Sequence, residues 1–347
     1  MSSPFRYLIT LEPLGLLYAS SGRFLSAENL VGQAGEHFPP DSPAIAGLIA
    51  AQLPRSEVRV LHTAGPFWQR AGELFLPAPL NLLQAKAEES RSSRQVKERL
   101  VWQASEDDST PGGWRPASGR EPPVKPLRGG WLPLSQWCQQ AQVGTEVQAN
   151  PWKALPHLHP RLREDERVSA QQDALFLELA VALEPGVSLA YLSSHEIPAG
   201  RYRFGGEGHL VELCSSPVPQ ALLTLMAEPL SGKSFALVTP GLWGGSRLSL
   251  REPLIHGQTA GVQPWHRHGH GPAILTDRPQ PWRHRLGAGG DGQPRLSRGR
   301  WALPAGSCYH GPPGLELPPW PDWPENWFPK EGFSFKQLGT GLALPLP

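Results

Sequence analysis

Prolines and glycines recur along the whole sequence and favour short secondary structure elements. The chain of 347 residues contains 40 prolines and 37 glycines. Proline removes a backbone donor and ends or kinks a helix, and glycine weakens helices and strands alike. Yet 39% of the residues are hydrophobic and 13 are tryptophans, which argues against general disorder. We therefore expect short strands that are joined by long, ordered loops.

Charge and cysteine content limit the class of protein. The formal net charge is only +1, so a polyanion would have to be held by local basic patches. Cys138, Cys214 and Cys308 lie far apart without Cys-x-x-Cys spacing, which is typical of reduced thiols in the cytosol. The N-terminus lacks a signal-peptide pattern, and no apolar segment approaches the length of about 20 residues that spans a membrane. We expect a cytoplasmic protein without membrane contact.

A glycine-rich segment near residue 205 is the first candidate binding site. Three glycines follow a pair of arginines and precede a predicted strand over 209–213. Exposed amides in such a loop can form an anion-binding concavity, and guanidinium groups match phosphate geometry. The segment lacks the Gly-Lys-Ser/Thr ending of a Walker A loop. Two interpretations stay open: a cradle for a nucleic-acid backbone, or a hairpin turn in which the glycines serve only geometry. The residues concerned are Arg201, Arg203, Gly205, Gly206, Gly208 and His209.

A second basic region extends from Thr276 to Arg300. Its arginines, at positions 278, 283, 285, 295, 298 and 300, outnumber its aspartates, at 277 and 291, by four. Trp282 and Trp301 supply faces on which bases could stack. The alternation over 295–303 predicts a strand with Arg298 and Arg300 on one side, although edge strands also carry arginine to prevent aggregation. Arg23, in a glycine-containing loop, and Lys336, in a tail strand, are further candidates for phosphate contact.

Histidine pairs and clusters raise a metal-site hypothesis. His157 and His159 alternate in one segment, and a second segment carries His266, His268 and His270. A structural zinc site takes four ligands, and flexible histidine tracts seldom form specific sites. We therefore expect no metal and no cofactor. A metalloenzyme built on the second cluster remains an alternative.

Local patterns also predict elements and their limits. Asp41 or Ser42 can cap a helix with Pro43 in its first turn and apolar residues at 45, 48, 49 and 53. Residues from about 84 to 133 are charged and rich in Ser, Gly and Pro, which indicates a partly flexible insertion with one strand near 99–103. Strands are predicted over 6–17, 58–61, 173–183, 187–193 and 234–239, helices over 131–140 and 220–228, and two strands around a Gly-x-Gly turn over 332–345.

Several segments, taken together and in order, resemble the RAMP superfamily of CRISPR proteins. The nearest family is the third subunit of the type III-B (Cmr) effector, in its cyanobacterial-type variant. The resemblance covers most of the chain. The segments that carry it are 7–15, 38–47, 150–152, 156–161, Tyr202-Arg-Phe-Gly-Gly-Glu-Gly-His209, Leu296-Ser-Arg-Gly-Arg300 and Gly332-Phe-Ser-Phe-Lys336 with the following glycines.

The resemblance implies a fold and a role. The fold would be α+β, with two ferredoxin-like (RRM-like) lobes over 1–183 and 184–347 and long Pro/Gly-rich loops; the insertion at 84–133 departs from the family. The implied role is a non-catalytic one. The chain would bind the 5′ repeat-derived handle of crRNA and cap the backbone filament, in contact with the large Palm-domain subunit and a backbone RAMP subunit, in antiviral defence.

A catalytic reading remains as an alternative. A RAMP-type endoribonuclease that processes crRNA could use His195 or His209 as general acid or base beside the cationic loop. The sequence contains no nucleophile elbow, no carboxylate metal pair at a recognisable spacing and no nucleotide fingerprint, so we expect no enzyme activity.

Overall fold

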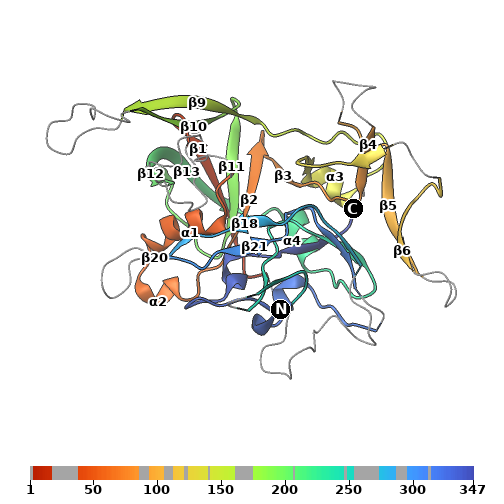
Figure 1. Ribbon diagram of the computed structural model, residues 1–347. Helices are drawn as coiled ribbons and strands as arrows, with labels where there is room; N and C mark the ends of the chain where they lie inside the picture. Colours follow the sequence, from red (N-terminus) through yellow and green to blue (C-terminus); the bar gives the residue numbers. More distant parts are fainter. Residues whose placement is uncertain are drawn as a thin grey trace, which may run out of the picture.

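The computed structural model shows a mixed α/β, strand-rich protein built around two antiparallel sheets (Figure 1). It describes residues 3–17, 38–85, 94–104, 112–120, 124–139, 141–160, 175–205, 208–245, 248–253, 273–286, 295–311 and 314–347. Within these residues no helix is long and apolar enough to cross a membrane.

The larger sheet has seven strands in the order β12-β13-β1-β11-β2-β3-β8. Every neighbouring pair in it is antiparallel. Its strands alternate buried and exposed residues only near the β12 edge, because the central strands are buried on both faces. The strands are β1 (Tyr7–Pro13), β2 (Thr63–Arg70), β3 (Glu73–Pro77), β8 (Trp131–Pro133), β11 (Val187–Ser193), β12 (Gly200–Phe204) and β13 (His209–Pro217).

The smaller sheet has four strands in the order β17-β22-β14-β23 and contains the C-terminal strand. Helix α4 (Gln220–Met226) connects the two sheets, since it follows β13 and precedes β14. Its buried residues Leu222 and Met226 belong to the core that the sheets share. The strands are β14 (Ser234–Leu237), β17 (Ala273–Leu275), β22 (Cys308–His310) and β23 (Ala343–Pro345).

Both sheets contain four strands in the order of a ferredoxin-like unit, but most of its helices are not found. Numbered along the chain, β13-β1-β11-β2 and β23-β14-β22-β17 both read 4-1-3-2. Helix α1 (Ser42–Ala50) joins β1 to β2 as that fold requires. In the described part of the chain, the other three crossovers contain strands or short 3₁₀ turns instead of α-helices. The turns are η1 (Trp320–Asp322), η2 (Glu325–Trp327) and η3 (Phe335–Leu338). Two complete ferredoxin-like lobes are therefore not confirmed.

The predicted division at residue 183 does not coincide with a boundary between sheets. Strands β11, β12 and β13 lie after residue 184, yet β11 and β13 both pair with β1. The larger sheet therefore joins the start of the chain to residues up to 217. Local composition does not reveal a pairing between segments so far apart in the sequence.

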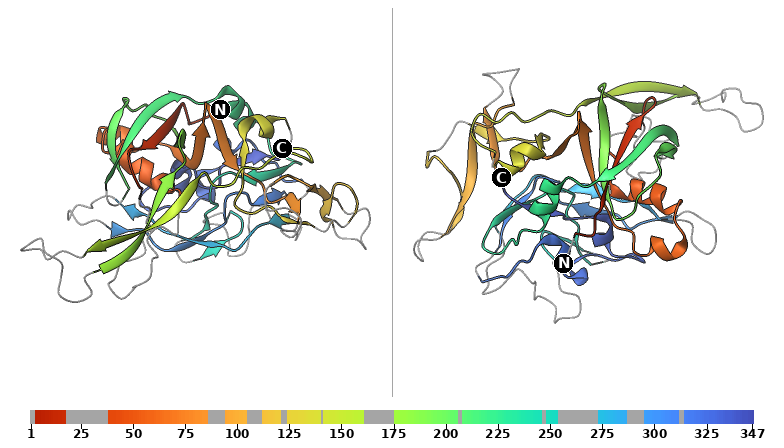
Figure 2. Two further views of the ribbon diagram at one scale, coloured as in Figure 1. Left: turned by 90° about the horizontal axis from the view of Figure 1, so that it is seen from above. Right: turned by 180° about the vertical axis from the view of Figure 1, so that it is seen from behind.

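The larger sheet is buried on both faces near its centre (Figure 2). Ile45 and Ile49 of α1 pack in one cluster with Ile9 and Tyr191. Asp41 is the N-cap residue and Pro43 lies in the first turn, as predicted, but no side chain caps the helix. On the opposite face, a sheet residue such as Phe67 shares a cluster with residues of the smaller sheet.

The insertion forms a small sheet of its own. Strand β5 confirms the one expected near 99–103, and three further strands join it in the order β6-β5-β4-β7. Trp102 of β5 stacks on His310 of the smaller sheet, with ring centroids 4.9 Å apart, and so attaches the insertion to the C-terminal half. The strands are β4 (Leu82–Ala85), β5 (Glu98–Gln103), β6 (Gly113–Pro116) and β7 (Val124–Pro126); helix α3 (Leu134–Cys138) follows β8.

The remaining elements are short, apart from one long ribbon. Strands β9 (Trp152–Pro160) and β10 (Leu175–Leu183) form a two-stranded ribbon that projects from the molecule in Figure 1. The predicted strand at 58–61 is instead the end of α2 (Arg55–Val58), and the first predicted tail strand is η3 (Phe335–Leu338). The other pairs are β15 (Trp243–Gly244) with β16 (Ser249–Leu250), β18 (Gln280–Trp282) with β21 (Arg300–Ala302), and β19 (Arg285–Leu286) with β20 (Arg295–Leu296).

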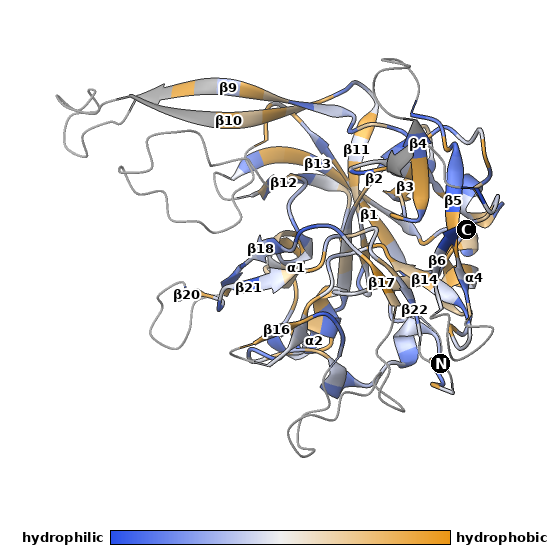
Figure 3. Cartoon of the chain, turned by 45° about the vertical axis from the view of Figure 1, so that its right-hand side comes forward, coloured by the Kyte–Doolittle hydropathy of each residue, from blue (hydrophilic) through white to orange (hydrophobic). Residues whose placement is uncertain are grey.

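Hydrophobic residues concentrate where the sheets meet, as the orange segments of β1 and β3 show in Figure 3. Gly339 allows the closest approach there, because it has a φ of +65° and a Cβ at this position would lie 2.6 Å from the carbonyl oxygen of Thr63. The last turn before β23 therefore packs directly on β2.

Gly339→Ala should lower the free energy of unfolding by about 3 kcal/mol, because a left-handed alanine is strained and its methyl group collides with β2. Urea denaturation monitored by tryptophan fluorescence measures the change. Gly299→Ala is the matched control, since nothing lies within 4 Å of its Cβ and no positive φ is required. Equal stabilities of the two variants would contradict this account of the contact.

Candidate RNA interface

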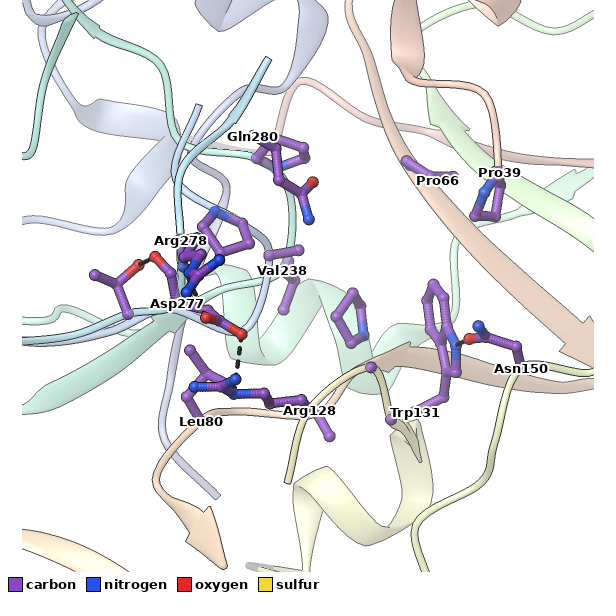
Figure 4. A pocket seen from close by; sticks show the side chains of 18 of the residues that line it. Pro39, Pro66, Leu80, Arg128, Trp131, Asn150, Val238, Asp277, Arg278 and Gln280 are labelled. Carbon is purple, nitrogen blue, oxygen red and sulfur yellow. Dashed lines mark hydrogen bonds and ion pairs between the residues drawn. The ribbon is translucent and has the colours of Figure 1, made fainter. Parts of the chain in front are cut away.

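A cleft of about 1150 Å³ lies between the larger sheet, the insertion and the C-terminal half. The β3–β8 edge of the sheet forms one side, through Pro77 and Trp131, and the segment that leads into β18 forms the other. Figure 4 shows the side chains of both sides pointing toward the opening. Its polar and aromatic lining residues include Phe38, Arg128, Trp131, Asn150, Trp152, Arg251, Asp277, Arg278 and Gln280.

One side of the cleft is an aromatic wall. The rings of Trp131 and Trp152 meet edge to face at 5.8 Å, and Phe38 meets Trp152 at 5.1 Å. The indole Nε1 of Trp131 donates to the Asn150 side-chain oxygen at 2.8 Å, which holds the ring in place. Behind it, Trp131 packs against the buried Trp68. Trp131 is itself buried, so the half-buried rings of Phe38 and Trp152 supply the apolar surface at the opening.

The opposite side carries charge. Nε of Arg128 lies 3.0 Å from an Asp277 carboxylate oxygen, and the other oxygen of Asp277 accepts the backbone N–H of Arg278 at 2.7 Å. Arg128 is 67% exposed, and an ion pair this open to water stabilises by at most about 1 kcal/mol. An incoming phosphate can therefore compete for Arg128. Arg251 adds a further cation to the same lining.

The loop that carries Arg128 belongs to the insertion, and its backbone is held from behind. The guanidinium of Arg94 donates to the carbonyl oxygens of Arg128 and Gly129 at 2.6 and 3.2 Å. Gly129 has a φ of +60°, and a Cβ on Gly130 would lie 2.5 Å from Val147. Both glycines are thus required by the turn. The insertion, predicted to be partly flexible, supplies a defined wall of the cleft.

A ribbon of two strands continues from the cleft. Gln280 lines the cleft and begins β18, which pairs with β21. On this ribbon Pro281 lies opposite Trp301, whose side chain is 58% exposed. Arg298 is also exposed, whereas Trp282 is buried. Of the two tryptophans considered for base stacking, only Trp301 presents a face to solvent.

Two of the cations that were predicted to contact phosphate bind partners within the protein. The Arg300 guanidinium is buried and lies 2.6 Å from a Glu331 carboxylate oxygen and 4.9 Å from the ring of Phe335. The Lys336 ammonium donates to the carbonyl oxygens of Pro321 and Trp323 at 2.8 and 2.6 Å. Because these cations already have buried partners, the prediction that they contact RNA does not fit the structure.

The glycine-rich segment forms a hairpin at the opposite edge of the larger sheet from the cleft. Gly205 and Gly208 have φ values of +79° and +63° in the turn between β12 and β13. Arg201 and Arg203 are exposed on one face of β12, and His209 is half-buried. Strands β12 and β13 pair up to Phe204 and His209, so the glycines lie in a hairpin turn. Gly206 and Arg23 lie outside the described residues.

The histidine candidates are not gathered into a metal-binding cluster in the described residues. The Ser194 hydroxyl lies 2.8 Å from Nδ1 of His195 but also accepts the backbone N–H of His62. Nε2 of His195 is 3.9 Å from Glu57, which is too long for a hydrogen bond. Within the described ranges no three metal-ligating side chains come together. The cluster at His266, His268 and His270 lies outside those ranges.

The sequence alone did not predict that the residues of the cleft form a binding site. Arg128, Gly129, Gly130 and Trp131 combine a cation, a tight turn and an aromatic ring, which is the kind of signal that was noticed near residue 205. Their neighbours in the sequence are polar and rich in proline, so the whole stretch was interpreted as an insertion. Only the tertiary structure brings them opposite Asp277.

Comparison with known proteins identifies the family. The family model described as CRISPR-associated protein (Cas_Cmr3) matches residues 9–332. The chain belongs to the Cmr3 family of CRISPR-associated proteins. The family expected from the motifs is thereby confirmed, and this Cmr3-family chain is a subunit of a type III CRISPR effector. No curated protein matches the sequence.

Solved structures resemble the Cmr3-family chain only distantly. A chain of the type III-B Cmr-beta bound to cognate target RNA is 12% identical, with a TM-score of 0.46 over 88% of this chain and 86% of that chain. A chain of the Csm3-Csm4 subcomplex of the type III-A interference complex is 10% identical, with a TM-score of 0.37 over 90% and 94%. Family membership rests on the sequence match.

Lys336→Met in this Cmr3-family chain should lower the free energy of unfolding by about 2 kcal/mol, because two buried carbonyl oxygens lose their donor. Chemical denaturation measures the loss. Arg298→Met, at an exposed position, is the control and should change stability by no more than about 0.5 kcal/mol. A Lys336→Met protein that was as stable as the wild type but no longer retained RNA would support the predicted contact of Lys336 with phosphate.

His284 makes stability depend on pH. Its ring is buried against Trp282 of β18 and Phe335, and burial lowers its pKa from 6.5 to about 4. Below pH 6.5 the unfolded chain therefore binds a proton that the folded chain does not bind, and stability falls as the pH drops toward 4.

The measurement is the free energy of unfolding of the wild type and of His284→Gln between pH 7 and pH 4.5. The wild type should lose about 2 kcal/mol more than the variant over this range. Parallel curves for the two proteins would show that His284 is not the titrating group.

Proposed function

We propose that this Cmr3-family chain is a non-catalytic RNA-binding subunit whose cleft holds a single-stranded segment of the 5′ repeat-derived handle of crRNA. The observation that supports the proposal is the pairing of half-buried rings with exposed arginines in one cleft, at Phe38, Trp152, Arg128 and Arg278. Single-stranded RNA offers unstacked bases for the rings and phosphates for the guanidinium groups.

The polar groups of the cleft suggest how the RNA is oriented. Arg128 and Arg278 would contact phosphate, which positions the strand without reading its sequence. The amide of Gln280 faces the opening (Figure 4) and would contact base edges. The RNA would leave the cleft along the β18–β21 ribbon, past Trp301 and Arg298, because Gln280 belongs to both the cleft and this ribbon.

The overall charge favours RNA binding within an assembly. A net charge of +1 provides little non-specific attraction for a polyanion, so the isolated chain should hold RNA weakly. We propose that the chain caps the backbone filament of the effector, beside the large Palm-domain subunit and a backbone RAMP subunit. The two sheets in 4-1-3-2 order would then be two ferredoxin-like lobes that have lost most crossover helices.

The test compares two double charge reversals in the assembled complex. Arg128→Glu with Arg278→Glu should lower crRNA retention at least about tenfold, because two phosphate contacts become repulsive. Arg201→Glu with Arg203→Glu changes the net charge equally at the opposite edge of the sheet and tests the glycine-rich segment as the rival site. RNA co-purified with tagged subunit is quantified and sized.

Each outcome decides between sites. Loss of crRNA only in the cleft variant supports the cleft, and loss only in the hairpin variant moves the site to the glycine-rich segment. Full retention in both variants rejects RNA binding by either surface. Repeat RNA incubated with the complex should stay intact; cleavage that disappears in His195→Ala or His209→Ala would instead favour the endoribonuclease alternative.

A further inference from the structure

An acidic side chain lies among the arginines of the cleft. Arg128, Arg251 and Arg278 line the cleft together with Asp277. A carboxylate in a cleft that receives phosphate repels that phosphate, and it also occupies a cation that the phosphate would use. The other acidic residue of the lining, Asp41, is the N-cap residue of α1. Asp277 therefore lowers the attraction of the cleft for any polyanion, unless the ligand also offers it a partner.

The two carboxylate oxygens of Asp277 have different partners. One oxygen accepts the backbone N–H of Arg278 at 2.7 Å, which holds the carboxylate in place. The other oxygen lies 3.0 Å from Nε of Arg128, which it faces in Figure 4. The Asp277 side chain is 30% exposed, against 67% for Arg128. When a phosphate takes Arg128, the first oxygen keeps its partner and the second one loses it.

The released oxygen requires a new hydrogen-bond donor. A partly buried carboxylate oxygen that loses its partner without replacement reduces the free energy gained by binding. The phosphate cannot supply the donor, because phosphodiester oxygens only accept hydrogen bonds. The donors of a nucleic-acid strand are the N–H groups of its bases and, in RNA alone, the ribose 2′-hydroxyl.

The arrangement of the cleft favours the ribose hydroxyl over a base. The half-buried rings of Phe38 and Trp152 would hold the bases on one side, so the sugar–phosphate backbone would follow Arg128 and Arg278 on the other. The 2′-hydroxyl is attached to the ring carbon next to the one that carries the 3′ phosphate. A phosphate bound to Arg128 would therefore bring a hydroxyl close to Asp277, whatever the base sequence.

We propose that Asp277 selects RNA over DNA in the cleft by accepting a hydrogen bond from a ribose 2′-hydroxyl. The inference rests on the proposed binding of crRNA and adds the residue that distinguishes its sugar. Phosphate replaces Asp277 at Arg128, and the hydroxyl replaces Arg128 at Asp277. A deoxyribose strand makes only the first exchange and leaves a carboxylate oxygen unpaired beside its phosphate. Asp277 thus attracts the correct ligand and repels the incorrect one.

The first experiment compares RNA with DNA. Labelled single strands of the repeat-derived handle, with ribose or with deoxyribose and the same bases, are titrated with the full chain at low salt, and binding is followed by fluorescence anisotropy. The wild type should bind the RNA at least about fivefold more tightly, as expected for a hydrogen bond to a charged group. In Asp277→Ala the DNA should bind about threefold more tightly than to the wild type, because Arg128 is released.

The RNA-to-DNA affinity ratio should accordingly fall at least about threefold in Asp277→Ala. Glu228→Ala is the matched control. It also removes one negative charge and an exposed ion pair of 3.0 Å, in this case with Lys233, and both of these residues line a separate cavity. The ratio of the control should equal that of the wild type.

The second experiment assigns the hydroxyl. Each ribose of the RNA strand is replaced in turn by deoxyribose, and its affinity for the wild type and for Asp277→Ala is measured. At one position the replacement should weaken binding at least about fivefold in the wild type but less than about twofold in the variant, because groups in contact are not additive. Equal losses in the two proteins at every position would overturn the proposal.

The two proposals fail in different ways. Arg128→Glu with Arg278→Glu should weaken the binding of both strands if the cleft holds nucleic acid, independently of Asp277. If this double variant binds both strands as the wild type does, the cleft is not the site and both proposals are rejected. If it weakens both strands but Asp277→Ala leaves the RNA-to-DNA ratio unchanged, only the selection by Asp277 is rejected.

Discussion

The larger sheet depends on burial of both faces at its centre, and the rest of the molecule is arranged around that burial. Successive residues of β1 point to opposite sides, so Leu8 enters the core shared with the smaller sheet and Ile9 enters the core under α1. A fully buried side chain of this size contributes about 1.5–3 kcal/mol. A shift of one residue in register would exchange the two sets, which is why the pairing of β1 with β11 is specific.

The cleft and the β12–β13 hairpin lie at the two edges of the larger sheet, away from the centre where both faces are buried. At one edge, β3 and β8 meet the insertion and the C-terminal half around the cleft, and the weak ion pair of Arg128 with Asp277 spans it. At the other edge, β12 and β13 keep α1 on one side but carry exposed side chains on the other. The two edges differ in chemistry: the cleft combines rings with cations, and the exposed side of β12 and β13 carries both arginines and a glutamate, Glu212, beside Leu210.

Similar residue types have different roles in the basic region. Arg298 is exposed, whereas Arg300, two positions later, is buried against Glu331, because residues 297–299 lie between β20 and β21 and do not continue the alternation that would place both arginines on one side. Lys336 is likewise bound to backbone carbonyl oxygens of a tail rich in proline and tryptophan. A count of arginines and lysines therefore overestimates the surface that can hold RNA, since burial decides which cations remain accessible.

The sequence by itself determined the family, the start of α1 at Ser42 and strands such as β11, because these depend on motifs and periodicity within a short segment. It did not determine that the segment near Gly205 is a hairpin at one sheet edge, or that Arg128 and Asp277 face each other across a cleft. Those facts depend on which distant strands pair and which faces are covered. Contacts between residues far apart in the chain are decided by packing of the whole molecule, and only the tertiary structure contains that information.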